Sequence, residues 1–416
     1  MKSILPLLKA TQDASVAVRK LSDQQRAGLL IVLANKVEGN SARIITENQK
    51  DLDVMDDADP KKDRLLLNEK RILDLAQSLR EIAALPDPTG EILLERTIEQ
   101  GLSLRKVTVP LGVVGVIYES RPNVTLDVAS LCLRSGNACV LKGGKEAHFS
   151  NTYLVGLIHE SLSEFGIPNG AVTLLPTGRE FVMELLTATK YVDIIIPRGS
   201  ESLIKFVRQN SLVPTIETGA GVCHTYIDKT GDLNKAAKIV VNAKVSRPSV
   251  CNSLDTVLVD REVADAFLPK LKDDFIKWNV EVFADETSFG ILQKADYPYL
   301  RKAEPEDFGR EFLDYKCSVK VVEGLNEALE HIRAFSSRHS EAIISSDSEA
   351  IESFLNEVDA AAVYANASTR FTDGAVFALG AEIGISTQKL HARGPFALEK
   401  LVTEKWIVRG DGQVRW

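Results

Sequence analysis

From residue 112 onward, short and nearly continuous apolar segments alternate with amphipathic segments of helical length. The first of them, VVGVIY at 113–118, has the composition of a strand that is buried on both faces of a sheet. Strands that alternate with helices form βαβ units, and such units build a parallel sheet. The predicted strands are 113–118, 138–141, 172–175, 192–196, 254–259, 319–322, 342–345 and 361–365. The predicted helices between them are 150–165, 180–187, 200–209, 261–277, 325–334 and 348–358.

The region before this alternation has a helical pattern. Ser22 followed by Gln25 is a capping-box signal, and it predicts a helix over 23–37. A second amphipathic helix is predicted over 69–83, and the acidic segment 51–63 is predicted to be a solvated turn between helices. At the other end of the chain, residues 403–416 are predicted to be extended.

Length and charge limit the classes of protein to consider. A chain of 416 residues is expected to form two or three domains. The net charge of −8 argues against a general nucleic-acid binder, which usually carries a basic face. The apolar stretch 29–34 is far too short to span a membrane, and the first residues do not resemble a signal peptide. We therefore expect a cytoplasmic protein.

Several common site motifs are absent from the sequence. The five cysteines are an odd number and include no CxxC pair, so neither a disulfide framework nor a zinc site is indicated. The six histidines show no HExxH spacing. Neither GxxxxGK[ST] nor GxGxxG after a strand occurs. No metal site is predicted.

One cysteine differs from the others in its surroundings. Cys132, Cys139, Cys223 and Cys317 lie among apolar or β-prone residues, where a thiol behaves as a small buried hydrophobe. Cys251 lies in the polar segment SRPSVCNS, just before a predicted strand. A thiol on a polar loop near an arginine can be exposed and partly ionised. These residues alone leave a nucleophile and a structural thiol equally open.

Several segments resemble the gamma-glutamyl phosphate reductases, a family within the aldehyde dehydrogenase superfamily. They occur in the family's order, and two of them, 366–374 and 386–395, are specific to the reductases rather than to the superfamily. The matching segments are 110–125, 135–138, 141–146, 221–224, 244–252, 366–374 and 386–395.

The resemblance implies an aldehyde-dehydrogenase-like α/β fold with two parallel-sheet α/β domains and a small oligomerisation arm. The implied ranges are 1–96 and 110–219 for the cofactor-binding domain, 220–365 for the catalytic domain, 366–399 for a substrate-site segment that returns toward the cofactor domain, and 97–109 with 400–416 for the arm. A homo-oligomer is therefore expected. Because an acyl phosphate is labile, transient docking with glutamate 5-kinase is a further hypothesis.

The resemblance also implies a reaction. L-Glutamate 5-phosphate is reduced to L-glutamate 5-semialdehyde, the second step of proline synthesis, through a thioester on Cys251. The oxyanion would be held by the backbone N–H of that cysteine and by the side-chain amide of Asn123. Because this direction needs no hydrolytic water, Glu217 is interpreted as structural or as a substrate contact rather than as a general base.

The same resemblance implies where the cofactor binds. Lys142 and Gly143 match the superfamily's contact to the adenosine ribose, and Glu311 matches the glutamate that holds the nicotinamide ribose. Many NAD-using relatives have a glutamate at the position of Lys145. Since a lysine attracts a 2′-phosphate that a carboxylate would repel, NADP(H) is the expected cofactor.

An acidic substrate requires cations and hydrogen-bond donors. The favoured substrate contacts are Arg121, Arg247, Ser368, Thr369, Arg370 and Arg393, with Lys389 and His391 as further candidates. Three other functions stay open. One is a cysteine hydrolase that pairs Cys251 with His224, another is a dehydrogenase for a different small acidic aldehyde, and the third is a non-enzymatic scaffold.

Overall fold

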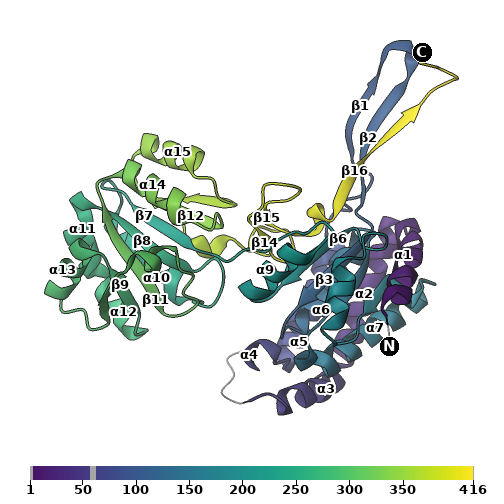
Figure 1. Ribbon diagram of the computed structural model, residues 1–416, viewed down its shortest axis with the longest axis horizontal. Helices are drawn as coiled ribbons and strands as arrows, with labels where there is room; N and C mark the ends of the chain where they lie inside the picture. Colours follow the sequence, from purple (N-terminus) through teal and green to yellow (C-terminus); the bar gives the residue numbers. More distant parts are fainter. Residues whose placement is uncertain (1–2, 57–61, 416) are drawn as a thin grey trace. The chain divides into compact units, whose positions relative to one another are not determined.

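A computed structural model describes residues 3–56 and 62–415 (Figure 1). The chain divides into two compact units. Unit 1 comprises residues 1–218, 378–384 and 395–416, and unit 2 comprises residues 219–377 and 385–394. The chain therefore passes from one unit to the other four times. The first passage, after residue 218, lies one residue before the boundary that the sequence predicts.

Unit 1 begins with helices that the sequence predicts only in part. The helices are α1 (Leu5–Lys20), α2 (Asp23–Gly39), α3 (Ser41–Asp53), α4 (Lys62–Leu65) and α5 (Glu69–Ala84). The capping box before α2 is confirmed: the Ser22 hydroxyl accepts the N–H of Gln25, whose side chain accepts the N–H of Ser22. Helices α1 and α3 were not predicted.

The predicted solvated turn at 51–63 is wrong at its start, and its residues 57–61 lie outside the described part of the chain. Asp51 belongs to α3 and is buried. Its carboxylate accepts the N–H groups of Phe149 and Ser150 at 3.0 and 2.8 Å, in the first turn of α7 (His148–Glu164). The carboxylate thus satisfies free amide groups at a helix start, which a count of acidic residues cannot reveal.

The sheet of unit 1 confirms the first four predicted strands. It is parallel, with the order β5-β4-β3-β6. Its strands are β3 (Val113–Tyr118), β4 (Ala138–Lys142), β5 (Val172–Leu174) and β6 (Ile194–Arg198). Besides α7, the helices α6 (Asn123–Arg134), α8 (Glu180–Leu186) and α9 (Glu201–Asn210) follow these strands. Apolar side chains of α1, α8 and α9 pack in one core cluster with β3, β4 and β6.

The arm in unit 1 is an antiparallel sheet of three strands. The central strand β2 (Ser103–Pro110) pairs with β1 (Ile92–Thr97) and with β16 (Val402–Arg409). The arm therefore starts before residue 97, where the sequence places its start. At its base, the Asn137 amide donates to the carbonyl of Leu401 and accepts the N–H of Gly112, each at 2.8 Å.

Unit 2 holds a parallel sheet with the order β10-β9-β11-β8-β7-β12-β13. The strands are β7 (Cys223–Ile227), β8 (Leu254–Asp260), β9 (Glu281–Ala284), β10 (Leu300–Lys302), β11 (Lys316–Val322), β12 (Ser340–Ile344) and β13 (Ala362–Ala365). The sequence did not predict β7, β9 or β10.

Helices cover both faces of this sheet. One core cluster includes side chains of α10 (Leu233–Val245), α11 (Arg261–Phe267), α12 (Lys272–Lys277) and α13 (Glu286–Lys294). The opposite cluster includes α14 (Leu325–Phe335) and α15 (Ser348–Glu357). The single helix predicted over 261–277 is wrong. A 3₁₀ turn, Leu268–Leu271, separates α11 from α12, because Pro269 has no N–H for a continuous helix. Across the described residues, no helix is both long and apolar enough to cross a membrane.

Candidate active site

Cys251 lies in a turn between the end of α10 and the start of β8. All five cysteines are described, none of them forms a disulfide, and Cys251 alone is not buried. Burial raises the pKa of the Cys317 thiol to about 12, and it raises the pKa of Cys223 and Cys132 as well. These three thiols stay protonated at neutral pH. Cys251 is therefore the cysteine that a reagent or substrate reaches most readily.

The segment before β7 supports the backbone of Cys251. The Cys223 thiol donates to the Cys251 carbonyl at 3.3 Å. Gly221 packs so closely that a Cβ there would overlap the Cys251 carbonyl. The N–H of Gly221 donates to a carboxylate oxygen of Glu311 at 2.7 Å. Glu311, the predicted cofactor contact, is thus hydrogen-bonded to the segment that packs against the backbone of Cys251.

A second segment holds the other side of the Cys251 loop. The Arg370 guanidinium donates to Ser246 Oγ at 3.1 Å and to the side-chain oxygen of Asn252, so it bridges the two ends of the loop. The Asn252 amide in turn donates to the carbonyl of Thr372 at 2.9 Å. Two segments that carry the resemblance, 244–252 and 366–374, are thereby joined around the thiol.

Positive charge gathers at this loop. Burial lowers the pKa of Arg370, and the charge of nearby Arg247 lowers it further. Arg247 is exposed and lies four residues before Cys251. Two guanidinium groups favour a thiolate and an anionic ligand at the same place. The predictions for Arg247 and Arg370 thus fall at one site.

The two hydroxyl groups predicted as anion donors have structural partners. Thr369 is fully buried, and its hydroxyl donates to the Asn252 carbonyl at 2.8 Å. The Ser368 hydroxyl is buried and accepts the N–H of Arg370 at 3.3 Å, as a cap of a 3₁₀ turn. The bond to Asn252 uses the only proton of the Thr369 hydroxyl, so this hydroxyl does not donate to a substrate here. The Ser368 hydroxyl accepts a bond and keeps its own proton, so its role as an anion donor stays a prediction.

Arg393 is also engaged elsewhere in unit 2. Its guanidinium donates to the carboxylate and the backbone carbonyl of Asp359, at 2.6 and 2.9 Å. Lys389 Nζ lies 2.8 Å from the same carboxylate. Hydrogen bonds from these two cations lower the pKa of Asp359 to about 2. The structure therefore gives Arg393 and Lys389 a shared ion-pair partner, Asp359, and a substrate contact from Arg393 stays a prediction.

The pairing of Cys251 with His224 in a hydrolase is not supported. Successive side chains of a strand point to opposite faces, and the Cys223 thiol faces Cys251. His224 therefore faces away. It is fully buried, and its Nδ1 lies 3.0 Å from the Glu341 carboxylate. A histidine held in this way cannot serve as the base for Cys251.

In unit 1, the predicted cofactor residues lie at the carboxyl end of β4. Lys142 is buried, and its ammonium donates to the carbonyls of Gly143 and Thr177 at 3.2 and 3.1 Å. Burial lowers its pKa. A Cβ on Gly143 would overlap the Asn151 side chain. Lys145 is exposed, and among the described residues no carboxylate pairs with it.

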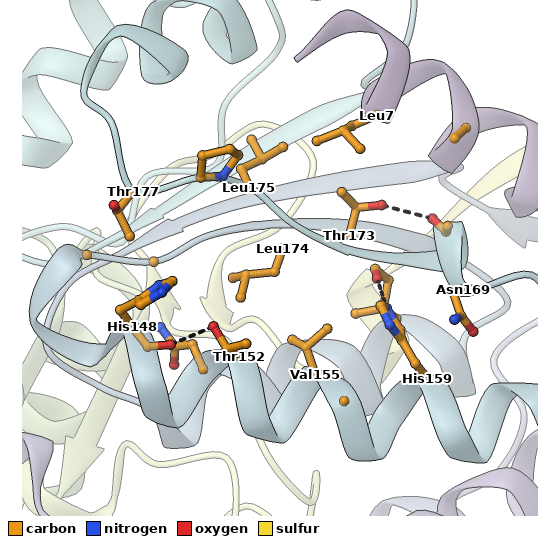
Figure 2. Close-up of a pocket in the computed structure, with 18 residues that line it drawn as sticks. Leu7, His148, Thr152, Val155, His159, Asn169, Thr173, Leu174, Leu175 and Thr177 are labelled. Carbon is orange, nitrogen blue, oxygen red and sulfur yellow. Dashed lines mark hydrogen bonds between the residues drawn. The ribbon is translucent and has the colours of Figure 1, made fainter. Parts of the chain in front are cut away.

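A pocket of about 590 Å³ adjoins this loop (Figure 2). It lies between α7, β5 and α1, and side chains from these elements point into it in Figure 2. Val155 and Leu174 line it with apolar side chains, and Gly143 and Gly144 also line it. A mostly apolar cleft beside a glycine pair and two lysines fits an adenosine with its phosphates.

Asn123 is the first residue of α6, and Arg121 lies two residues earlier; both side chains are partly buried. The Asn123 amide donates to a carboxylate oxygen of Asp127 at 3.0 Å, which orients the amide and leaves it a second N–H. The sequence offered a signal for this partner, since positions four apart share a helix face. Glu217, also in unit 1, lies 3.5 Å from Arg208, and its interpretation as structural or as a substrate contact stays a prediction.

The carboxyl of Asp127 predicts a pH dependence of stability. Burial raises its pKa to about 6, although the Asn123 hydrogen bond opposes the rise. The folded protein then binds more protons than the unfolded chain between about pH 4 and 6, so this group lowers stability as pH rises through that window. Relative to wild type, Asp127→Asn should gain stability from pH 4 to 6 and change little above. Urea midpoints at several pH values test this, and a relative loss over that window would contradict it.

Comparison with known proteins places this arrangement in a class. The model of the aldehyde dehydrogenase family matches residues 4–296. The gamma-glutamyl phosphate reductases of Legionella pneumophila (strain Paris) and Pelodictyon phaeoclathratiforme are each 54% identical to this chain. The first match covers 98% of both chains, and the second covers 100% of this chain and 99% of the relative. The chain belongs to the aldehyde dehydrogenase family and, within it, to the gamma-glutamyl phosphate reductases.

Solved structures agree. The crystal structure of gamma-glutamyl phosphate reductase from Thermotoga maritima matches with a TM-score of 0.94 at 39% identity, over 100% of both chains. An acetylating aldehyde dehydrogenase from Geobacillus thermoglucosidasius shares the fold, with a TM-score of 0.70 at 17% identity over 99% of this chain and 97% of that one. The predicted aldehyde-dehydrogenase-like α/β fold is confirmed. Within the described residues, no group of three or more metal-ligating side chains occurs.

Proposed function

We propose that this protein reduces L-glutamate 5-phosphate to L-glutamate 5-semialdehyde, with NADPH as reductant and release of phosphate, in the second step of proline synthesis. One observation carries the proposal. The partly exposed Cys251 lies in a loop that Arg370 bridges, beside a second guanidinium, so a nucleophile and an anion-binding charge occur together. The names of the relatives supply the substrate.

The chain's own residues account for the covalent steps. The Cys251 sulfur attacks the acyl carbon, and the carbon–oxygen bond to phosphate breaks as the thioester forms. Arg370 and Arg247 offset the charge of the leaving phosphate. The backbone N–H of Cys251 and the amide of Asn123 are the proposed oxyanion donors. After reduction, the carbon–sulfur bond breaks, which forms the aldehyde and regenerates the Cys251 thiolate.

The cofactor fit rests on unit 1. Lys142, Gly143 and Lys145 are proposed to hold the ribose and phosphates, with Glu311 of unit 2 for the nicotinamide ribose. The absent Cβ atoms of the glycine pair leave room that any other residue would fill. When bound, the nicotinamide group supplies the hydride that reduces the thioester. Arg121 is proposed to contribute to substrate binding.

Lys145 predicts the choice between the two nicotinamide cofactors. Its exposed ammonium attracts a 2′-phosphate, and a carboxylate at this position would repel one while accepting ribose hydroxyls. Lys145→Glu should shift the ratio of kcat/KM for the phosphorylated over the unphosphorylated cofactor downward by at least about tenfold. Lys190→Glu, elsewhere in unit 1, is the charge-matched control. A ratio that stays the same in both variants would remove Lys145 from the cofactor site.

The decisive experiment runs the reaction in reverse. Purified protein receives the semialdehyde, NADP⁺ and inorganic phosphate, and the absorbance of reduced cofactor is followed. Cofactor reduction that requires phosphate is expected. Reduction without phosphate would instead indicate a hydrolytic aldehyde dehydrogenase and would return Glu217 to consideration as a base. Failure with either nucleotide would overturn the proposal.

The arm leads us to propose self-association as well. Its strands carry exposed apolar side chains, among them Ile92, Leu93, Trp406 and Val408. An exposed apolar surface on a sheet with open edges is typical of a contact between copies. Light scattering should give a mass above that of one chain, and a single species of 45.6 kDa would exclude it. Docking with glutamate 5-kinase remains a hypothesis that no contact described above supports.

A further inference from the structure

The short loop after β3, which we call the β3 loop (residues 119–122), has an unusual backbone. Ser120 has a φ of +43°, in the left-handed region that a residue with a Cβ adopts at a cost. It is 4% exposed, so solvent does not stabilise this conformation. The loop runs directly into α6, whose first residue is Asn123. The backbone at Ser120 therefore sets the direction in which the proposed oxyanion residue is presented.

Glu146 holds Ser120 in this conformation. A single carboxylate oxygen of Glu146 accepts both the backbone N–H of Ser120, at 2.7 Å, and its hydroxyl, at 2.9 Å. Glu146 comes from the loop after β4, directly after Lys145. Gly144 makes the contact possible, because a Cβ there would overlap the Glu146 carboxylate.

The β3 loop is also tied on its other side. A carboxylate oxygen of Glu119 accepts the backbone N–H of Ser200 at 2.9 Å, after β6. A Cβ on Gly199 would crowd this carboxylate. Since β3 lies between β4 and β6 in the sheet, the two adjacent residues Glu119 and Ser120 join the loop to both of its neighbours.

We infer that Glu146 is a positioning residue that fixes the strained β3 loop. It thereby couples the cofactor loop, which we define as residues 143–146 after β4, to Asn123 and Arg121. This inference rests on the proposed function for its catalytic consequence. Glu146 acts as a hydrogen-bond acceptor toward the protein backbone. Its neighbour Lys145 faces solvent at the cofactor loop, so the two adjacent side chains serve different partners.

Three variants test this role. Glu146→Ala removes the acceptor, so Ser120 can relax to negative φ and Asn123 can shift. We expect kcat of the reverse reaction to fall by about tenfold or more, while KM for NADP⁺ changes less than about threefold. Glu146→Gln keeps an oxygen that can accept both bonds, and it should retain most of kcat. In the double variant E146A/S120G, glycine adopts the left-handed φ without strain, and part of kcat should return.

The charges of Glu146 and Glu180 both oppose the lowering of the Lys142 pKa by burial. Glu180→Ala is therefore the matched control, because Glu180 starts α8 and does not bond Ser120. It should leave kcat nearly unchanged. The inference is overturned if E146Q loses as much kcat as E146A and S120G restores nothing, since charge would then be the cause. It is also overturned if E146A keeps its kcat and instead shows a higher KM for NADP⁺, because that result would indicate that Glu146 contacts the cofactor.

A readout without turnover separates this inference from the proposed function. Hydrogen exchange at the amides of 120–123 should be faster in E146A than in wild type and near wild type in E146Q. If wild type shows no phosphate-dependent activity, the proposed reaction fails, and hydrogen exchange still decides whether Glu146 holds the loop. Unchanged exchange in E146A would overturn the inference.

Discussion

Replacing Cys251 by alanine is expected to lower phosphate-dependent reduction of NADP⁺ by at least about a thousandfold while leaving the fold intact. The reason is that the proposed route forms a covalent bond to this sulfur, and alanine offers no atom to form it. Its side chain is partly exposed, so its removal leaves little cavity. Steady-state rates of the purified variant, together with its circular dichroism spectrum, are the measurements.

Alkylation gives an independent control for this prediction. Iodoacetamide should modify Cys251 first, because the other four cysteines are buried. Mass spectrometry of the peptides identifies the labelled residue, and the loss of activity should follow its labelling. Cys132→Ala is the matched variant, since it removes a thiol from the buried face of α6 and should keep activity. Full activity in Cys251→Ala, or inactivation that follows another cysteine, would contradict the proposed nucleophile.

Replacing Lys244 by methionine is expected to have the largest effect on stability, a loss of about 3 kcal/mol or more in the free energy of unfolding. The Lys244 ammonium is fully buried at the end of α10. It donates to the carbonyls of Asp314 and Lys316 at 3.1 and 2.8 Å, and it lies 3.7 Å from the Asp255 carboxylate. Methionine fills the volume but leaves these groups without a cation. Urea unfolding followed by circular dichroism measures the loss.

The double variant K244M/D255N tests the cause. Burial raises the pKa of Asp255 to about 7 even though Lys244 opposes the rise, so removing the lysine makes the charged carboxylate still less favourable. Asparagine keeps an oxygen for the N–H of Phe312, which Asp255 accepts at 3.0 Å, and it carries no charge. The double variant should therefore be more stable than K244M. Equal stability of K244M and wild type would show that this buried pair contributes nothing.

Local patterns predicted most of the regular elements because their causes are local. The Ser22–Gln25 capping box depends on residues three apart, and β3 and residues 138–141 of β4 have apolar sequences. Short elements with mixed composition could not be predicted in this way. Strands β9 and β10 have only four and three residues, and their pairing depends on neighbours distant in sequence. Pro269 is a local signal too, and it divides the helix predicted over 261–277 despite the apolar pattern on both sides of it.

The candidate site could likewise be predicted from the sequence only where the cause of a feature is local. The position of Cys251 on a polar turn follows from local residues, and the structure confirms that placement. Thr369 and Arg370 both donate to Asn252, which lies 117 and 118 residues earlier in the chain. No local pattern indicates that the Thr369 hydroxyl is hydrogen-bonded there. Glu146 stands beside Lys145 in the sequence, yet its bond to Ser120 depends on how two neighbouring strands end.

The pairing of β2 with β16 has a consequence for biosynthesis. These strands lie about 300 residues apart in the chain, and β16 ends at residue 409 of 416. On the ribosome, β2 must keep one edge unpaired until β16 has also been made. An unpaired strand edge invites association with other chains. Nascent chains that stall or terminate before residue 402 should therefore depend on chaperones or aggregate, and a bulky carboxyl-terminal tag should slow the final closure of the arm.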